Sequence, residues 1–425
     1  MKPIELIEKL KNGALDKYAK MYTDTKEQSE RYIKAINEFC RIYGNDRDIA
    51  VFSVPGRSEI SGNHTDHNHG CVLAGAIDRD IIAIAAKSEE KVVRIQSEGY
   101  SEDRVELSLA SDPNCFKKHC SRALVAGMCG GFVKYGYKVG GFDAYTTTEV
   151  LKGSGLSSSA AFECMVGNIM NHFYNEGKVP NEEIAKIAQY SENVYFGKPC
   201  GLMDQMACAV GGFVFIDFAD PKNPIVEPIS FSLSDAGYRF CIVNTKGNHS
   251  DLTPDYAAVP AEMKSVASYF GREVLRGITE SQIVENIPVL RRAIGDRAIL
   301  RAIHFIREND RVNTLAKHLK EKNVDAFLLG VIDSGNSSFK YLQNVYTNAN
   351  PSEQGLSLAL CVTEGALAGK GCAYRVHGGG FAGTIQAFVK NEYAEEYATL
   401  LNSMFGADAS MMLNIRAEGA IKVEI

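Results

Sequence analysis

The sequence has no long apolar run, no excess of basic residues and no paired cysteine motif. The best apolar stretch, residues 81–86, is far shorter than the roughly 20 residues that span a bilayer, which argues against a membrane protein. The 46 Lys and Arg residues are outnumbered by 52 Asp and Glu, so we expect no global basic surface for nucleic acid. With 45% hydrophobic and 23% charged residues, the composition is that of an ordinary globular protein.

The cysteines argue against a zinc ribbon or a disulfide framework. There are 11 of them, an odd number at scattered spacings, and no two form a Cys-x-x-Cys pair. Reduced, mostly buried thiols in a reducing compartment are the simplest interpretation. Because residues 1–9 are also charged and contain no secretory core, we predict a cytoplasmic protein, monomeric or weakly homo-oligomeric.

Hydrophobic periodicity predicts an α+β chain of two lobes. Residues 1–45 follow a helical period, and strands are then expected at 49–54, 72–86, 91–96 and 142–150. Further strands are expected at 212–218 and 238–244, followed by a mainly helical region from about 260 to 368 and an alternating C-terminal part. No linker marks the boundary, which we place so that the lobes comprise residues 1–210 and 211–425.

A glycine- and serine-rich segment precedes a strongly amphipathic helix. It reads Gly153-Ser-Gly155-Leu156-Ser157-Ser158-Ser159-Ala-Ala, and apolar residues then recur at helical spacing from 162 to 173. Glycines allow backbone N–H groups to approach an anion, and a helix N-terminus adds partial positive charge. The segment matches neither the P-loop nor the Gly-x-Gly-x-x-Gly pattern. Phosphate binding and a plain turn with capping serines both remain open.

A dense polar cluster covers residues 63–69, with three histidines and one aspartate among its last six positions. This spacing suits neither a helical His-x3-His face nor a zinc knuckle. We expect a loop after the 49–54 strand that presents polar side chains to a sugar-like polyol. A structural loop and a metal site are the alternatives.

Two acidic residues stand out further along the chain. Asp204 lies among apolar neighbours, where desolvation raises a carboxyl pKa and suits a general base, although a capping aspartate is the alternative. Glu192 lies twelve residues upstream near the end of a helical stretch and, taken alone, reads as a solvated residue.

Together and in this order, these segments resemble the galactokinase branch of the GHMP kinases. Four blocks carry the resemblance across about residues 50–390: Pro55-Gly56-Arg57 through Gly62-Asn63-His64-Thr65-Asp66, the 153–161 segment, Pro199-Cys-Gly201-Leu-Met-Asp204-Gln205, and Gly378-Gly-Gly380-Phe-Ala-Gly383. The resemblance implies an N-terminal lobe like ribosomal protein S5 and a ferredoxin-like C-terminal lobe, with the active site between them. It also implies ATP- and Mg²⁺-dependent phosphorylation of the C1 hydroxyl of a hexose, most simply D-galactose.

The resemblance assigns a role to individual residues. Asp204 would accept the proton of the C1 hydroxyl, and Arg57 would stabilise the moving negative charge and keep Asp204 ionised. Ser159 and Glu192 would hold Mg²⁺. The ATP loop would comprise Gly153, Gly155, Leu156, Ser157, Ser158 and Ser159. The sugar contacts would be Asn63, His64, Asp66, Gly201 and Tyr256.

The first block departs from the family pattern in a way that leaves the sugar open. Asn63 stands where the family has a glutamate that bonds the C6 hydroxyl, and Glu59 stands where it has an asparagine. An amide at position 63 can serve a C6 hydroxyl, but it also tolerates a C6 carboxylate that glutamate repels. His377 replaces a common threonine, and no tryptophan is available for the adenine. A galacturonate or N-acetylgalactosamine kinase, a catalytically silent sugar- and ATP-binding regulator, and a metalloprotein are therefore the alternatives.

Overall fold

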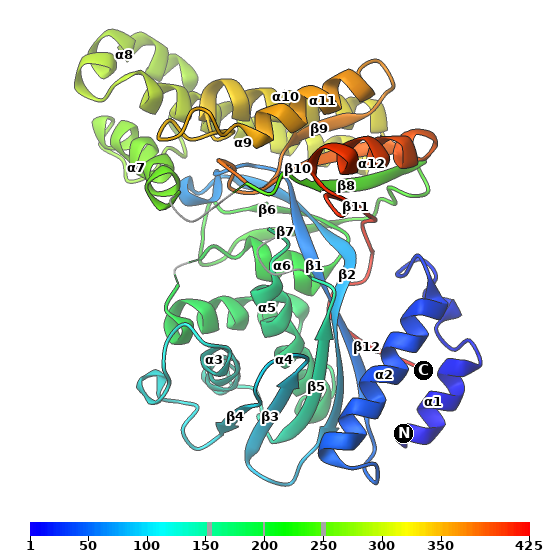
Figure 1. The fold of residues 1–425 in the computed structure, drawn as a ribbon. Helices are drawn as coiled ribbons and strands as arrows, with labels where there is room; N and C mark the ends of the chain where they lie inside the picture. Colours follow the sequence, from blue (N-terminus) through cyan, green and yellow to red (C-terminus); the bar gives the residue numbers. More distant parts are fainter. Residues whose placement is uncertain (151–154, 199, 248–251) are drawn as a thin grey trace.

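The computed structural model describes residues 1–150, 155–198, 200–247 and 252–425. Gly153 of the expected ATP loop lies outside these residues. Figure 1 shows two stacked lobes, with helices and strands mixed in both, and the chain termini close together at the side of the lower lobe. The α+β class expected from the sequence is confirmed.

The lower lobe is built on an eight-stranded sheet. Its main path runs β12-β1-β2-β5-β3-β4, and β6 and β7 are added through β2. All pairings are antiparallel except that of β3 with β5. The strands are β1 (Ala50–Ser61), β2 (Cys71–Lys87), β3 (Val92–Ser97), β4 (Asp103–Glu106), β5 (Phe142–Thr148), β6 (Phe213–Asp217), β7 (Ile225–Ile229) and β12 (Ile421–Val423).

The first strand is longer than the sequence pattern indicated, and the expected polar loop begins only after residue 61. β1 continues to Ser61, and its register with β2 shifts between Pro55 and Arg57 and again between Glu59 and Ser61. Such irregularities let a strand bend while its pairing continues. The start of the first sequence block therefore lies on the strand, and only residues 62–70 form the connection to β2.

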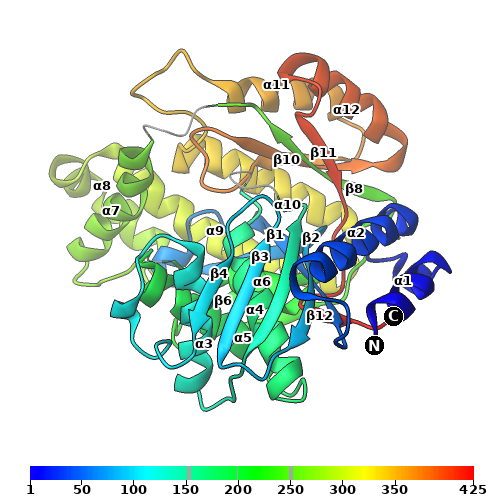
Figure 2. The same cartoon turned by 60° about the horizontal axis from the view of Figure 1, so that its bottom comes forward.

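Alternating side chains of the sheet serve two separate cores. Ala83 and Ala85 of β2 pack in the core shared with α4, whereas Ile82 and Ile84 pack against the N-terminal helices. Figure 2 shows the sheet between these layers. The helices of this lobe are α1 (Pro3–Lys11), α2 (Thr25–Tyr43), α3 (Ser121–Lys134), α4 (Ser158–Tyr174), α5 (Asn181–Tyr190) and α6 (Met203–Val210).

The upper lobe combines a four-stranded antiparallel sheet with six helices among the described residues. Its strand order is β11-β8-β10-β9. The strands are β8 (Tyr238–Asn244), β9 (Ala373–Val376), β10 (Thr384–Lys390) and β11 (Ser410–Leu413). The helices are α7 (Thr253–Tyr269), α8 (Glu280–Ala293), α9 (Asp296–Lys320), α10 (Val324–Ser337), α11 (Gly355–Leu367) and α12 (Asn391–Phe405).

The two lobes share an apolar core. Ile60 of β1 and Leu73 of β2 belong to the same apolar cluster as Phe240 and Phe388 of the upper sheet. The expected division at residue 210 falls just before β6, but β6 pairs with β2 in the lower sheet. The end of the chain also returns to the lower sheet, where β12 pairs with β1. A division there remains a prediction.

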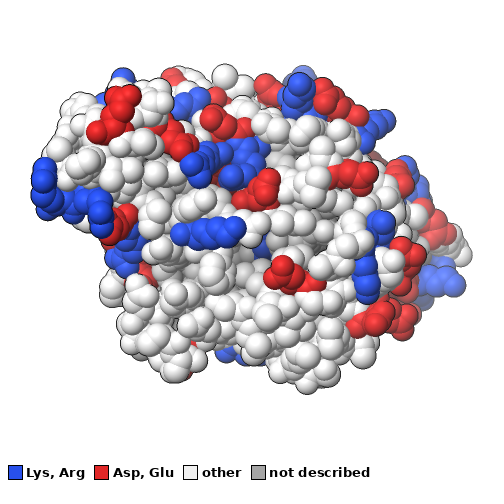
Figure 3. All heavy atoms as spheres, turned by 90° about the horizontal axis from the view of Figure 1, so that it is seen from above, with Lys and Arg blue, Asp and Glu red and all other residues white. Residues whose placement is uncertain are grey.

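The surface carries no broad region of one charge on the face seen from above, where basic and acidic side chains are interspersed (Figure 3). Among the described residues, no helix combines the length and apolar character needed to cross a bilayer.

Candidate active site

The bent part of β1 holds the serine-rich segment in place. The Arg57 backbone N–H donates to the Leu156 carbonyl at 3.1 Å. Gly56 permits this approach, because a Cβ added there would lie only 2.8 Å from the same carbonyl oxygen. The first and second sequence blocks, about 100 residues apart, therefore meet at Arg57.

Arg57 and Asp204 form a close ion pair. The Arg57 Nε and Nη2 atoms lie 2.8 and 2.7 Å from Asp204 Oδ1, and the Ser157 hydroxyl donates to Asp204 Oδ2 at 2.6 Å. Arg57 also donates to the Gly155 carbonyl at 2.5 Å. The predicted partners Arg57, Asp204, Gly155 and Ser157 are thus brought together.

The pKa of Asp204 shifts in the direction opposite to the one expected from its apolar neighbours. Burial raises this pKa, but the charge of Arg57 and the hydrogen bonds from Ser157 and Arg57 lower it below its ordinary value. The desolvation argument alone was therefore wrong in its net sign. Asp204 is held ionised, and an ionised carboxylate at this place can accept a proton from an alcohol.

Helix α4 begins at Ser158 without a side-chain cap from the preceding residue. Ser157 adopts a left-handed conformation with φ of 59°, and its hydroxyl is directed to Asp204 rather than back to the helix. Gly155 has a φ of 74° and lies against His377, whose Cε1 would be 3.3 Å from an added Cβ. The capping alternative for Ser157 is not what the structure shows, and the amide end of α4 suits a phosphate group.

The two predicted metal ligands lie side by side. The Ser159 hydroxyl donates to Glu192 Oε1 at 3.5 Å, and Glu192 is 3% exposed on the π-helical turn η4 (Ser191–Phe196). The Lys198 ammonium lies 3.2 Å from the same Oε1 atom. A carboxylate and a hydroxyl are donors that suit Mg²⁺, and the position of Lys198 shows that this oxygen already faces a cation.

Two further residues at this place were given no role by the sequence analysis. Gln205 Nε2 donates to Glu192 Oε2 at 2.8 Å and to Glu163 Oε2 at 3.4 Å, and both Gln205 and Glu163 are fully buried. Burial, followed by the nearby charge of Glu192, raises the pKa of Glu163 well above its ordinary value. A signal was present, because Glu163 is an acid on an otherwise apolar helix face.

The predicted sugar contacts come from both lobes. Asp66 lies on the short helix η2 (Asp66–Asn68) and approaches Gly201, where an added Cβ would be 2.9 Å from Asp66 Oδ2. His64 Nε2 lies 3.0 Å from the Gly379 carbonyl, and the Tyr256 hydroxyl donates to the Gly380 carbonyl at 2.9 Å. Gly379 and Gly380 therefore connect His64, in the loop at residues 62–70, to Tyr256 of α7.

His64 is held as a neutral imidazole. Burial lowers its pKa to about 4, with a smaller contribution in the same direction from His67. The two rings are 6.1 Å apart between centroids. Within the described parts of the chain, no group of three or more His, Cys, Asp or Glu side chains could hold a metal ion.

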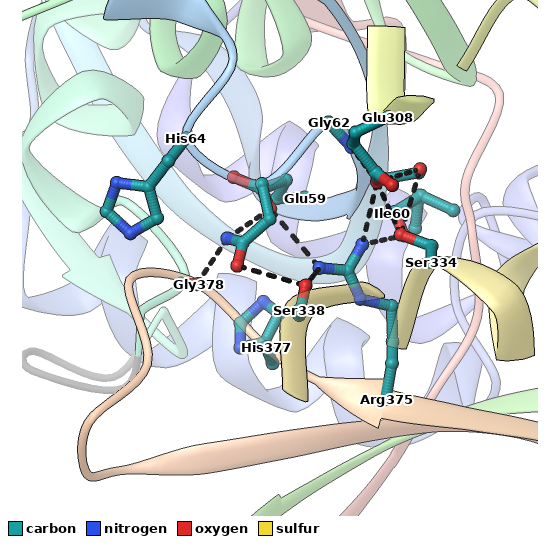
Figure 4. A network of polar contacts seen from close by, with 12 residues as sticks. Glu59, Ile60, Gly62, His64, Glu308, Ser334, Ser338, Arg375, His377 and Gly378 are labelled. Carbon is teal, nitrogen blue, oxygen red and sulfur yellow. Dashed lines mark hydrogen bonds and ion pairs between the residues drawn. The ribbon is translucent and has the colours of Figure 1, made fainter. Parts of the chain in front are cut away.

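Asn63 belongs to the buried polar network whose members Glu59, Ser338 and Gly378 are labelled in Figure 4. It is 1% exposed, and its amide donates to Glu59 Oε1 at 2.9 Å and to the Gly378 carbonyl at 2.7 Å. Its Oδ1 accepts from Asn344 at 2.7 Å and from Ser338 at 3.5 Å. These contacts occupy the amide with protein partners, and a direct contact of Asn63 with the sugar stays a prediction.

Arg375 lies at the centre of this network, between Glu59 and Glu308 (Figure 4). Its guanidinium is fully buried, 4.0 Å from Glu59 and 3.9 Å from Glu308, and it donates to the Ile60 carbonyl at 3.1 Å. Burial raises the pKa of Glu59 to about 7 in spite of Arg375. Arg375 therefore connects β9, which leads into the third glycine block, to the end of β1.

Two family models match parts of the chain. The galactokinase galactose-binding signature matches residues 37–87, and the N-terminal domain of GHMP kinases matches residues 123–212. A galactokinase of Actinobacillus pleuropneumoniae serotype 3 is 31% identical over 376 residues, which cover 86% of this chain and 92% of that protein. The chain belongs to the galactokinase family.

Other relatives agree with this assignment. A galactokinase of Streptomyces coelicolor is 28% identical over 87% of this chain and 92% of its own length. The solved structure of Lactococcus lactis galactokinase complexed with galactose has a TM-score of 0.75 at 23% identity, covering 91% of this chain and 98% of that one. A mevalonate kinase structure has a TM-score of 0.61 at 16% identity and covers 87% and 99% of the two chains. The fold is that of the GHMP kinases, as the sequence blocks implied.

Proposed function

We propose that this member of the galactokinase family transfers the γ-phosphoryl group of ATP to the C1 hydroxyl of D-galactose. The observation that carries the proposal is the Arg57–Asp204 ion pair, set against the serine-rich start of α4. The names of the relatives and the galactose-binding signature at residues 37–87 support galactose as the acceptor.

In the proposed reaction, Asp204 accepts the proton as the C1 oxygen attacks phosphorus, and the ADP oxygen leaves on the opposite side. Arg57 supplies positive charge on the path of the phosphoryl group, where charge stabilisation and in-line positioning account for most of the catalysis. Once its proton is taken up, the carboxyl no longer pairs with Arg57 as an anion, and the guanidinium is free to follow the phosphate charge.

The nucleotide would lie at the N-terminus of α4, where Leu156, Ser157 and Ser158 offer backbone and hydroxyl groups to phosphate oxygens. Ser159 and Glu192 would hold Mg²⁺, which neutralises phosphate charge when bound. His64, Asp66, Gly201 and Tyr256 would contact the sugar, because they converge next to the Asp204 block and the third glycine block. Asn63 would act on the C6 side.

The alternative acceptors are galacturonate and N-acetylgalactosamine, and Asn63 is the observation that favours them. A silent regulator that binds sugar and ATP is disfavoured, since Arg57, Ser159, Glu192 and Asp204 are all present and placed in pairs. We place the enzyme in the cytoplasm, in accord with its 11 free cysteines.

The proposal is tested by supplying ATP and Mg²⁺ with a panel of galactose, galacturonate, N-acetylgalactosamine and glucose. ADP formation identifies the acceptor, and ³¹P NMR of the product shows which oxygen carries the phosphate. We expect galactose 1-phosphate as the main product. Absence of ATP turnover with every aldose would overturn the proposal, and preference for galacturonate would move it to the alternative acceptor.

A further inference from the structure

Glu163 and Gln205 form a buried polar pair that the reaction described above does not use. Glu163 lies on α4, four residues after Ser159, and Gln205 lies on α6, directly after Asp204. Both residues have no exposed surface. Burying a carboxyl group and an amide is costly compared with burying apolar side chains of similar volume, so their presence needs a reason.

The amide nitrogen of Gln205 connects this pair to Glu192, the predicted metal ligand. Gln205 Nε2 donates to Glu192 Oε2 at 2.8 Å and to Glu163 Oε2 at 3.4 Å. The amide oxygen of Gln205 and the second carboxyl oxygen of Glu163, both Oε1, have no hydrogen-bond partner within the described residues. The amide is therefore directed with its nitrogen toward the two carboxyl groups, which places its unpaired oxygen on the opposite side.

This arrangement divides the two oxygens of Glu192 between two tasks. Oε2 is tied to Gln205, whereas Oε1 faces the Ser159 hydroxyl and the Lys198 ammonium. Without Gln205, the Glu192 side chain would lose the hydrogen bond that holds Oε2. Without Glu163, Gln205 would lose the second acceptor that holds its amide nitrogen on this side.

We propose that Glu163 and Gln205 are positioning residues that hold Glu192 with Oε1 directed at the bound divalent cation, Glu163 acting through Gln205. The inference rests on the proposed nucleotide and Mg²⁺ site. Hydrogen-bonded partners behind a metal ligand fix its orientation, and their loss typically lowers metal affinity by roughly 10- to 100-fold.

The test is a calorimetric titration of the full-length protein with ADP, performed once with Mg²⁺ and once with EDTA, and a separate titration with galactose. The ratio of the two ADP affinities measures the contribution of the metal without any turnover. In Gln205→Met and Glu163→Met, we expect this ratio to fall by about tenfold or more, with ADP affinity in EDTA and galactose affinity unchanged.

Three further variants separate positioning from packing. Glu163→Gln retains an acceptor for Gln205, so its ratio is expected within about threefold of wild type. The double variant Glu163→Met/Gln205→Met is expected to match Gln205→Met alone, because Glu163 acts through Gln205. Ile169→Val changes an equally buried residue on α4 and is the control for general disturbance, with an unchanged ratio.

An unchanged ratio in both methionine variants overturns the inference, as does an equal loss of ADP affinity in EDTA and of galactose affinity. A wild-type protein whose ADP binding does not respond to Mg²⁺ overturns it as well. The remaining outcome is that Mg²⁺ strengthens ADP binding in the wild type, that the methionine variants lose this effect, and that galactose is not phosphorylated. In that case the proposed acceptor is wrong, but the positioning role of Glu163 and Gln205 is supported.

Discussion

Two buried charge clusters in this molecule compensate their carboxyl groups to different degrees. In the first, the fully buried Asp80 of β2 is paired with Arg31 of α2 at 2.6 Å and with Arg416 at 3.2 Å. The hydroxyls of Tyr22 and Ser53 also donate to it, at 2.6 and 2.5 Å. One carboxylate is thus shared by two guanidinium groups, and this cluster ties the N-terminal helices and the end of the chain to the large sheet.

In the second cluster, beside the loop at residues 62–70, Arg375 lies between Glu59 and Glu308, and Glu308 also pairs with Arg311. Burial raises the pKa of Glu308, but His304, Arg311 and Arg375 lower it to about 2, whereas the pKa of Glu59 is raised to about 7. For Asp80, burial also acts upward, but Arg31 and Arg416 bring the net pKa below its ordinary value. The balance of opposite charges therefore decides which buried carboxyl group stays ionised, and the one left undercompensated lies next to Asn63.

The largest loss of stability is expected at Asp80, whose negative charge is shared by two guanidinium groups. Asp80→Asn leaves Arg31 and the fully buried Arg416 without their shared anion, and should lower the free energy of unfolding by about 3–5 kcal/mol. Urea denaturation measures this difference. Asp78→Asn is the matched control on the same strand, where no ion pair is broken, and should cost less than about 1 kcal/mol. Equal losses of unfolding free energy in both variants would show that the ion pairs of Asp80 contribute no extra stability.

The Glu59–Asn63 pair provides the next test. Asn63→Glu puts a second carboxyl group where the amide now donates to Glu59 and Gly378, so two acceptors lose their donor. We expect kcat/KM for galactose to fall roughly 100-fold, equivalent to about 3 kcal/mol.

Exchanging both residues distinguishes this interpretation from a simple loss of Asn63. The double variant Glu59→Asn/Asn63→Glu again pairs one amide with one carboxyl group, and should recover at least about tenfold of the lost kcat/KM. A double variant as poor as Asn63→Glu would show that the two positions do not act as a pair. Parallel assays with galacturonate show whether residue 63 selects the C6 group.

The smallest effect concerns the pH dependence of stability. Because the pKa of Glu59 is about 7 in the folded protein and 4.5 ordinarily, the folded state binds this proton more tightly. Glu59 therefore contributes most to the free energy of unfolding below about pH 4.5, and this contribution is lost as the pH rises to about 7. Glu59→Gln should gain on the order of 2 kcal/mol relative to wild type between pH 5 and 8, measured by denaturation at each pH. A constant difference across this range would contradict the raised pKa.

Sequence reasoning predicted the fold more accurately than the contacts within it. Periodicity found α4 and the main strands because buried faces repeat. The family resemblance singled out Arg57, Asp204, Ser159 and Glu192, which lie in two close pairs, although their roles stay predictions. Periodicity ended β1 too early, since the bent strand carries polar residues that pair with protein groups rather than with water.

The features that the sequence did not predict depend on contacts between segments far apart in the chain. The net pKa of Asp204 is set by Arg57, 147 residues away, so apolar neighbours in the sequence predicted only the desolvation part, and only the family resemblance indicated that Arg57 keeps Asp204 ionised. The role of Gln205 depends on the meeting of α4, α6 and η4. The burial of Asn63 depends on contacts with residues of the upper lobe such as Asn344. Local patterns carry no information about such contacts.

The central claim, that Asp204 receives the proton while Arg57 keeps it ionised, is tested most directly by Asp204→Asn. Turnover with ATP and galactose and calorimetric binding of both galactose and ADP should be measured on the same preparation. The account predicts a fall in kcat of about 10²- to 10⁴-fold, with both affinities nearly unchanged. A variant that retains the turnover of the wild type would contradict it.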